Sequence, residues 1–170
     1  MPLPHPDPAQ FLSAYRDGLL HDTLNFWFPP NSTRALDTEH GGFLHCLARD
    51  GAVLDTDKSV WAQGRMTWML LTLYNTVQKN SNWLAWAENG LKFIEQHCFD
   101  TDGRMFFHVT RDGRPIRKRR YAYSESFASI ACAAHARATG SDRSAVRARE
   151  LFEQFVRWNF TPGLMPPKFT

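Results

Sequence analysis

The chain carries one motif twice: Gly41-Gly-Phe-Leu-His-Cys-Leu-Ala-Arg-Asp-Gly51, and then Gly103-Arg-Met-Phe-Phe-His-Val-Thr-Arg-Asp-Gly113. In each copy an apolar run leads into an Asp-Gly pair, which is a strong signal of a β-hairpin turn. A motif that recurs at a fixed spacing indicates that one supersecondary unit is repeated along the chain. We call the spacing from Gly41 to Gly103 the repeat offset, and it is the first guide to the fold.

Helical patterns surround both copies. Asp7 can cap a helix that starts at Pro8 and runs to about Phe28, before two prolines. After the first copy, apolar spacing predicts a helix over Asp57–Val77 and another from about Ser81 towards Cys98. The repeat unit is then hairpin, helix, helix.

The helices are expected to keep the repeat offset. This offset places three pairs of residues opposite each other: Trp61 and Tyr123, Phe93 and Phe155, and Ile94 and Val156. Repeated helix pairs bury their apolar faces by stacking, as an open solenoid or as a closed ring of two layers. Because the hairpins recur at one end of the pairs, we expect an all-α fold, an α/α toroid with short β-hairpin inserts between helices.

The chain is long enough for only part of such a ring. About five helices are expected, whereas closure needs roughly twice that number, so we expect residues 1–170 to be the amino-terminal portion of one barrel domain, with no second domain. The toroid would be incomplete, and apolar helix flanks would be left in water. A homodimer is therefore a possible assembly.

Composition excludes several classes of function. The chain is 43% hydrophobic, which suffices for a core, and its 20 basic and 17 acidic residues do not form the concentrated charge of a nucleic-acid binder. No segment has the length of apolar sequence that a membrane span needs, and no signal peptide is visible. Three scattered cysteines favour a reducing compartment, so we expect a cytoplasmic protein without nucleic-acid or membrane partners.

Three stretches carry a family resemblance that spans nearly the whole chain: Leu36-Asp-Thr-Glu-His-Gly-Gly-Phe43, Lys58-Ser-Val-Trp-Ala-Gln-Gly-Arg65 and Arg120-Tyr-Ala-Tyr-Ser-Glu-Ser-Phe127. They closely resemble the N-acylglucosamine 2-epimerase family. The resemblance implies an α/α barrel of six-hairpin type that epimerises or isomerises a monosaccharide or disaccharide by moving a proton at the carbon next to the carbonyl, with no cofactor. It also places the acid/base histidine pair on later helices, outside this chain.

Arg65 matches the family's active-site arginine. Its planar fork of donors suits a sugar oxygen or the oxygen of an enediolate. The alternative is a helix arginine paired with a carboxylate such as Asp57. Trp61 and Trp68 lie on the same predicted helix, where indole faces can stack on the apolar face of a sugar ring, although core packing is a common role for an isolated tryptophan.

Two further positions are candidates for sugar contact. Tyr123 matches an aromatic position whose hydroxyl points at the substrate in several family members, and it is the repeat partner of Trp61. His40, beside two glycines, could reach the rim of a pocket, although a loop histidine is often structural. Glu125 could face the pocket or could cap and pair within its helix, and the structural role is the one expected. The histidines form no zinc pattern, so no metal site is predicted.

Other interpretations remain open. The basic run Arg111–Arg120 is expected to be a solvated hairpin face rather than an anion site, and no Gly-rich phosphate loop is present. The chain could instead be a non-catalytic sugar- or protein-binding part-barrel that self-associates, since one family member is also known as a renin-binding protein. Glycoside hydrolysis, which α/α toroids also perform, lacks a convincing carboxylate pair here. The sequence does not select the particular sugar, or epimerisation over isomerisation.

Overall fold

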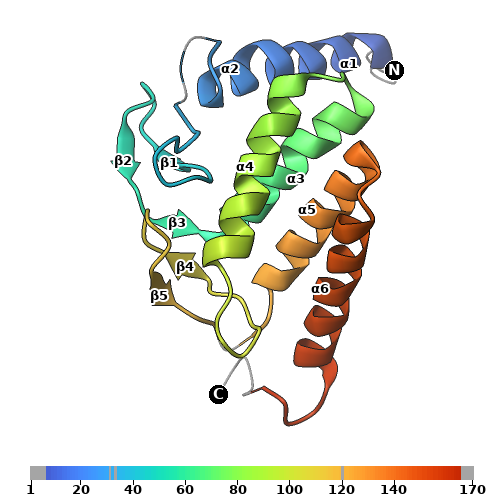
Figure 1. Cartoon of the computed structure of the whole chain (residues 1–170). Coiled ribbons are helices and arrows are strands. Elements are labelled where there is room, and N and C mark those ends of the chain that lie inside the picture. Colours follow the sequence, from blue (N-terminus) through green and yellow to red (C-terminus); the bar gives the residue numbers. More distant parts are fainter. Residues whose placement is uncertain (1–6, 31, 33, 120, 166–170) are drawn as a thin grey trace, which may run out of the picture.

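The computed structural model describes residues 7–30, 32, 34–119 and 121–165, so Arg120 of the basic run lies outside the described residues. Helices dominate, and all the short strands gather at one end of them (Figure 1). Within the described ranges no helix has both the length and the apolar character needed to cross a membrane.

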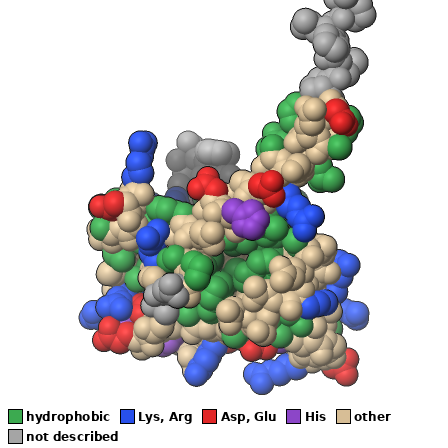
Figure 2. Space-filling view, turned by 90° about the horizontal axis from the view of Figure 1, so that it is seen from above, with side chains coloured by type: hydrophobic (Ala, Val, Ile, Leu, Met, Phe, Trp, Pro, Cys, Tyr) green, Lys and Arg blue, Asp and Glu red, His purple; other side chains and the backbone are tan. Residues whose placement is uncertain are grey.

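The predicted first helix is confirmed as one continuous helical segment. It comprises α1 (Pro8–Asp17), a π-helical stretch η1 (Gly18–Thr23) and α2 (Leu24–Trp27). The side chain of Asp7 accepts a hydrogen bond of 2.9 Å from the backbone N–H of Ala9, which caps the first turn. Only the second half of the segment packs on the core, and α1 stands out from the rest of the molecule (Figure 2).

The two predicted hairpins are present and obey the repeat. The first joins β1 (Cys46–Leu47) to β2 (Val53–Asp55), and the second joins β4 (His108–Val109) to β5 (Pro115–Arg117). Each strand of the second hairpin begins one repeat offset after its counterpart in the first. A further strand, β3 (Lys58–Ser59), pairs antiparallel with β4 and so connects the two units.

The four long helices are α3 (Val60–Thr76), α4 (Ser81–His97), α5 (Ser124–Thr139) and α6 (Asp142–Phe160). The helix expected from Asp57 begins at Val60, because Lys58 and Ser59 are extended in β3. Helices α3 and α5 pack side by side in one layer, and α4 and α6 pack on them in a second layer (Figure 1). The described helices form an arc and do not close a ring.

The predicted offset fails by one residue in the second layer. The caps of α4 and α6, Asn80 and Ser141, are one residue closer together than the repeat offset, because the linker between α5 and α6 is shorter than that between α3 and α4. Burial agrees with the shorter offset, since Ala87 and Ala148 are both buried. The predicted pairs Phe93–Phe155 and Ile94–Val156 were therefore both wrong by one residue. The shorter offset pairs Ile94 with Phe155, and Ile94 is buried whereas Val156 is exposed.

The core consists of two apolar clusters. One lies between the first helical segment, α3 and α4, and it includes Leu24, Phe43 and Leu70. The other lies between α3, α4, α5, α6 and the second hairpin, and it includes Val60, Phe93 and Leu151. Each helix pair is thus buried against its neighbour along the arc, as expected for stacked repeats.

Candidate functional site

Helices α3 and α5 approach each other closely because Gly64 has no side chain. A Cβ atom added at Gly64 would lie 2.8 Å from Cβ of Phe127 and 2.9 Å from its backbone carbonyl carbon. Only glycine fits such a contact between helices without a shift of the backbone. This contact fixes the surface that α3 and α5 present together.

Three of the predicted site residues form a stripe on α3. Trp61, Arg65 and Trp68 are spaced i, i+4 and i+7, so they lie on one face of the helix. Trp61 is half-buried and Arg65 is exposed, and the exposed fraction of Trp68 is 41%. Gln63 and Thr67 lie on the opposite side of the helix and are buried, and Gly64, beside the stripe, is buried against α5. The stripe is therefore available to a ligand.

Arg65 has no carboxylate partner among the described residues. Its guanidinium carbon lies 5.8 Å from the centroid of the Phe127 ring, a cation–π contact across the two helices. The alternative in which Asp57 pairs with Arg65 is not what the structure shows, since no ion pair joins them. Its hydrogen-bonding fork is thus not used within the described chain.

Tyr123 joins this group from the start of α5. Its exposed fraction is 45%, and its ring centroid lies 5.2 Å from that of Trp61 and 5.7 Å from that of Phe127. The indole N–H of Trp61 donates a hydrogen bond of 3.1 Å to Oγ of Ser124, which holds the indole in place. We call the surface formed by Trp61, Arg65, Trp68, Tyr123 and Phe127 the α3/α5 face.

A shallow hollow of about 300 Å³ extends this face along the helices. It is lined by Trp68 and Thr72 of α3 and by Ile130 and Arg137 of α5, among others. Apolar walls with a few polar groups are typical of small-molecule sites. The α3/α5 face is thus partly concave on the side of Trp68.

The structure does not bring His40 to the α3/α5 face. His40 lies in the turn before Gly41, and its Nε2 is 3.5 Å from Oε1 of Glu39. It lines a separate hollow of about 280 Å³ with residues of α4, including Asn89 and Gln96. Sugar contact by His40 stays a prediction that concerns a different part of the surface.

A buried ion network holds the turn that carries His40. Nζ of Lys58 is 2.9 Å from Oδ2 of Asp37, and Arg111 forms two hydrogen bonds of 2.9 and 3.0 Å to the same carboxylate. Burial raises the pKa of Asp37, but the hydrogen bonds from Arg111 and Lys58 outweigh it and hold the pKa well below its usual range. Arg111, the first residue of the basic run, is thus committed to a structural contact.

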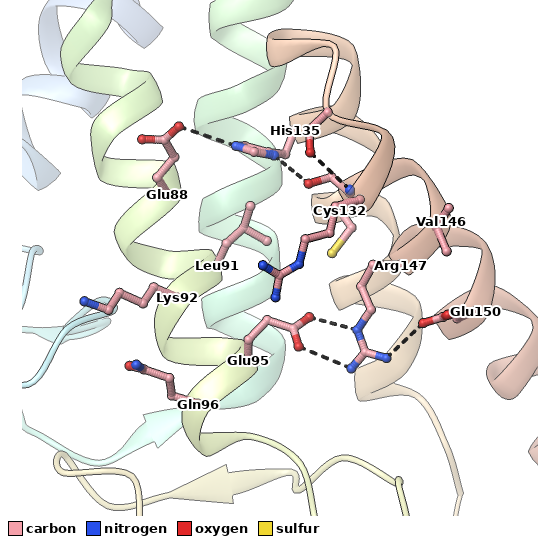
Figure 3. Close-up of a pocket in the computed structure, with 13 residues that line it drawn as sticks. Glu88, Leu91, Lys92, Glu95, Gln96, Cys132, His135, Val146, Arg147 and Glu150 are labelled. Atoms are coloured by element: carbon pink, nitrogen blue, oxygen red, sulfur yellow. Dashed lines mark hydrogen bonds and ion pairs between the residues drawn. The ribbon is translucent and has the colours of Figure 1, made fainter.

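A cavity larger than these two hollows lies in the other layer, and none of the five predicted residues lines it. This groove of about 860 Å³ lies between α4 and α6 above Cys132 (Figure 3). Arg147 of α6 pairs across the groove with Glu95 of α4, with N–O distances of 2.9 and 3.3 Å. Nδ1 of His135 is 2.8 Å from Oγ of Ser144. Burial raises the pKa of the Cys132 thiol to about 12, so it is not a thiolate nucleophile. The charged groups of the groove thus largely pair with one another.

Sequence reasoning did not identify two residues of the α3/α5 face and its hollow, Phe127 and Ile130. Phe127 underlies Arg65, and Ile130 faces Trp68 across the hollow. Each stands one repeat offset after the α3 residue that it accompanies, so the repeat was the signal that could have found them. On this surface the repeat had predicted only the pair of Trp61 and Tyr123.

Known structures share this architecture. A sugar epimerase from a ruminal bacterium matches with a TM-score of 0.74 and 27% identity, over 86% of this chain and 37% of that chain. A D-mannose isomerase matches with a TM-score of 0.72, over 90% of this chain and 36% of that chain, but at 19% identity it bears on the fold alone. The predicted fold class is confirmed: the arc is part of an α/α barrel of the kind found in sugar epimerases.

Sequence comparison narrows this class. The family model of N-acylglucosamine 2-epimerase (GlcNAc 2-epimerase) matches residues 42–161, and the chain belongs to this family. The N-acylglucosamine 2-epimerase of Homo sapiens is 39% identical over 126 residues, 72% of this chain and 30% of the human protein. The cellobiose 2-epimerase of Eubacterium cellulosolvens is 30% identical over 138 residues, 80% of this chain and 33% of that protein. The chain spans about a third of the length of these relatives.

Proposed function

We propose that this chain is the sugar-binding part of a carbohydrate 2-epimerase or isomerase that moves a proton at the carbon next to the sugar carbonyl. The observation that carries the proposal is Arg65, a cation with no carboxylate partner among the described residues, placed between the aromatic rings of the α3/α5 face. The family assignment supports the same reaction class. The substrate would be a monosaccharide or a disaccharide.

The chemistry of the face suits the binding half of such a reaction. Removing the proton next to a carbonyl leaves an enediolate, and a fixed cation beside the developing oxyanion lowers the barrier. The guanidinium of Arg65 can supply two parallel donors to neighbouring sugar oxygens. The rings of Trp61, Trp68 and Tyr123 can stack on the apolar face of a pyranose and orient it towards Arg65.

The proton transfer itself needs groups that α3 and α5 do not place on this face. Helix α3 contains no histidine, aspartate or glutamate. In α5 the groups that could accept a proton are Glu125 and His135. Glu125 is buried and accepts a hydrogen bond from Met105, and His135 contacts Ser144 in the groove between α4 and α6. We therefore expect this chain to bind sugar without exchanging its proton.

Sugar binding and proton exchange can be measured on the same sample. Tryptophan fluorescence should change on titration with N-acetylmannosamine or cellobiose, because Trp61 and Trp68 lie on the face. Arg65→Ala should weaken binding by about tenfold, the effect of losing hydrogen bonds to a charged group. Proton–deuterium exchange at the sugar carbon next to the carbonyl, followed by NMR in heavy water, should be absent.

Arg149→Ala is the matched control, because Arg149 is an exposed arginine on α6, a helix of the second layer, and is not part of the α3/α5 face. It should bind sugar as the unaltered chain does. Equal affinity for sugar in the Arg65 and Arg149 variants would contradict the proposal. Exchange catalysed by the chain would show that it contains a base outside the groups considered above.

A second function is favoured by the flank of α6. Val146, Phe152, Val156 and Phe160 are exposed on this helix, which suits a part-barrel that binds protein, including a second copy of itself. We propose a homodimer as its simplest form. The three free cysteines agree with a reducing, cytoplasmic setting for either function.

A further inference from the structure

Gln63 of the first repeat unit makes a pair of hydrogen bonds with Phe43, a residue of the isolated β-bridge before β1. Its side chain is fully buried, its Oε1 accepts a bond of 2.7 Å from the backbone N–H of Phe43, and its Nε2 donates a bond of 2.8 Å to the carbonyl oxygen of the same residue. An amide suits this place because it offers one acceptor and one donor side by side. All the polar atoms of this contact are satisfied.

Glu125 occupies the same place in the second unit. Glu125 stands one repeat offset after Gln63, and Met105 stands one repeat offset after Phe43. The Oε1 atom of Glu125 accepts a bond of 2.8 Å from the backbone N–H of Met105, as Gln63 does from Phe43. The Oε2 atom of Glu125 takes the place that the Nε2 donor of Gln63 has in the first unit. It is buried with no hydrogen-bond partner among the described residues.

If Glu125 were ionised, its buried Oε2 atom would carry negative charge without a hydrogen-bond donor beside it. The side chain is only 1% exposed, and a carboxylate can accept hydrogen bonds but cannot donate them. A buried polar atom without a partner costs about 1–3 kcal/mol, and a buried charge costs more. A protonated carboxyl group has the donor that the position requires.

We propose that Glu125 is a neutral carboxylic acid in the folded chain, that its Oε2–H donates to the carbonyl oxygen of Met105, and that it thereby positions the floor of the α3/α5 face. The positioning role rests on the proposed sugar-binding function. The neutral state of Glu125 and its hydrogen bond to Met105 rest on the repeat and on burial alone. Glu125 acts through Met105 and is a positioning residue.

Ser124, the residue before Glu125, links the start of α5 to the α3/α5 face. Oγ of Ser124 donates a hydrogen bond of 2.9 Å to the carbonyl oxygen of Phe106 and accepts one from the indole of Trp61. The ring of Phe107 packs edge-on against Trp61, with 5.0 Å between centroids. Ser124 and Glu125, in the first turn of α5, thus fix the segment Met105–Phe107. Through Phe107 this segment packs against Trp61 of the α3/α5 face.

The electrostatic surroundings agree with a neutral acid. Burial raises the pKa of Glu125, while hydrogen bonds from the backbone N–H groups of Met105 and of Glu125 itself, and the charges of Arg104 and Lys118, lower it to a smaller extent. Arg104 lies in the turn before the strand segment, and Lys118 follows β5, where it pairs with Asp100 and Asp102. Neither cation forms an ion pair with Glu125.

The protonation state can be read directly by NMR of isotope-labelled glutamate carboxyl carbons in the whole chain. The sequence has six glutamates, and Glu125→Gln assigns the resonance of interest. We expect this resonance to titrate at a pH above the ordinary glutamate pKa of 4.5. Titration of this resonance at or below that value would overturn the proposal.

Stability supplies a second readout. The folded chain should hold the proton of Glu125 at pH values where the unfolded chain has released it, so stability should fall as pH rises above the ordinary pKa of glutamate. Glu125→Gln should remove this decline and raise the urea midpoint at neutral pH, because the amide repeats the bonds of Gln63. Glu125→Ala should lower the midpoint, and Glu153→Gln, an exposed control on α6, should change neither.

Sugar affinity separates this inference from the proposed function. Glu125→Gln should keep the affinity, and Glu125→Ala should weaken it several-fold. If Glu125 titrates high but no variant binds sugar, the neutral acid stands and the proposed function fails. If binding depends on Arg65 while Glu125 titrates normally, the function stands and this inference fails.

Discussion

Single glycines set how closely the helices of this chain approach one another. At Gly64 a Cβ atom would collide with backbone and side-chain atoms of Phe127, whereas at Gly18 no atom lies within 4 Å of the added Cβ. Gly18 has φ of −60° and ψ of −37°, which any residue adopts in a helix. The two positions therefore separate a packing role from the intrinsic cost of glycine in a helix.

Gly64→Ala should destabilise the chain by about 1–3 kcal/mol, the usual cost of overpacking a tight contact. The methyl group can be accommodated only if α3 and α5 move apart. Gly18→Ala should instead stabilise it by about 0.4–1 kcal/mol through the unfolded state. Urea unfolding followed by circular dichroism measures both, and equal effects of the two substitutions would show that the α3–α5 contact is looser than described.

Sequence reasoning at the residue scale worked where periodicity alone determines position. Apolar spacing predicted a helix that contains Trp61, Arg65 and Trp68, and in α3 their i, i+4, i+7 spacing places all three on one face. The surroundings of His40 could not be predicted in this way. Its turn is held by Asp37, whose partners Lys58 and Arg111 are 21 and 74 residues away in the sequence, so only the folded chain determines its direction.

Among the elements, the contact of Asp37 joins three that are distant in sequence: the turn before β1, strand β3 and the β4–β5 hairpin. Lys58 is fully buried, and its Nζ donates to Asp37 and to the carbonyl oxygens of Gly41 and Arg111. Breaking a buried ion pair from one side leaves an uncompensated charge. The contact should therefore matter far more to stability than a surface ion pair.

Asp37→Asn should destabilise the chain by about 3–5 kcal/mol, because Lys58 would remain buried without its counter-charge. In the unaltered chain the folded-state pKa of Asp37 lies below its unfolded value. Its contribution is therefore complete above the unfolded pKa and disappears as the pH falls through the folded pKa. Urea midpoints across an acid series should show this loss in the unaltered chain and less of it in the variant.

Asp22→Asn is the control for this prediction, because Asp22 is exposed in η1. Its effect should be within about 0.5 kcal/mol, as for most surface substitutions. If the two variants unfold at the same urea concentration, the network around Lys58 does not contribute as its burial implies.

Element boundaries were predictable only as far as local signals specify them. The Asp-Gly turns located the two hairpins, the Asp7 cap located the start of α1, and α4 begins at Ser81 as apolar spacing predicted. The predicted start of α3, Asp57, was too early, since pairing of β3 with β4 keeps Lys58 and Ser59 extended. That pairing links segments about 50 residues apart, and no local pattern reports it.

At the scale of the whole molecule, the repeat explains which surfaces are covered and which are not. On α4, Leu91 packs on the second core cluster and Glu95 pairs with Arg147 of α6. With the shorter offset of the second layer, their counterparts on α6 are Phe152 and Val156. These have exposed fractions of 56% and 38%, because no helix pair among the described residues covers α6 as α6 covers α4.

This asymmetry predicts that the chain associates with itself through α6. Burying the flank removes apolar surface from water, at roughly 25 cal/mol per Å². Sedimentation velocity over a wide range of concentrations should show reversible growth beyond the monomer. Charges at both positions, Phe152→Lys with Val156→Lys, should shift the chain to monomer without loss of helix content, because both side chains already face water.

The matched control lies on α1, where Leu12 is 72% exposed and equally uncovered. If α6 carries the association, Leu12→Lys should leave it intact. A monomer at every concentration would contradict self-association, and loss of association in the α1 variant alone would transfer the interface to that helix. Since the substitutions on α6 leave the α3/α5 face unaltered, sugar affinity should be the same in monomer and assembly, which separates the binding function from the interaction function by experiment.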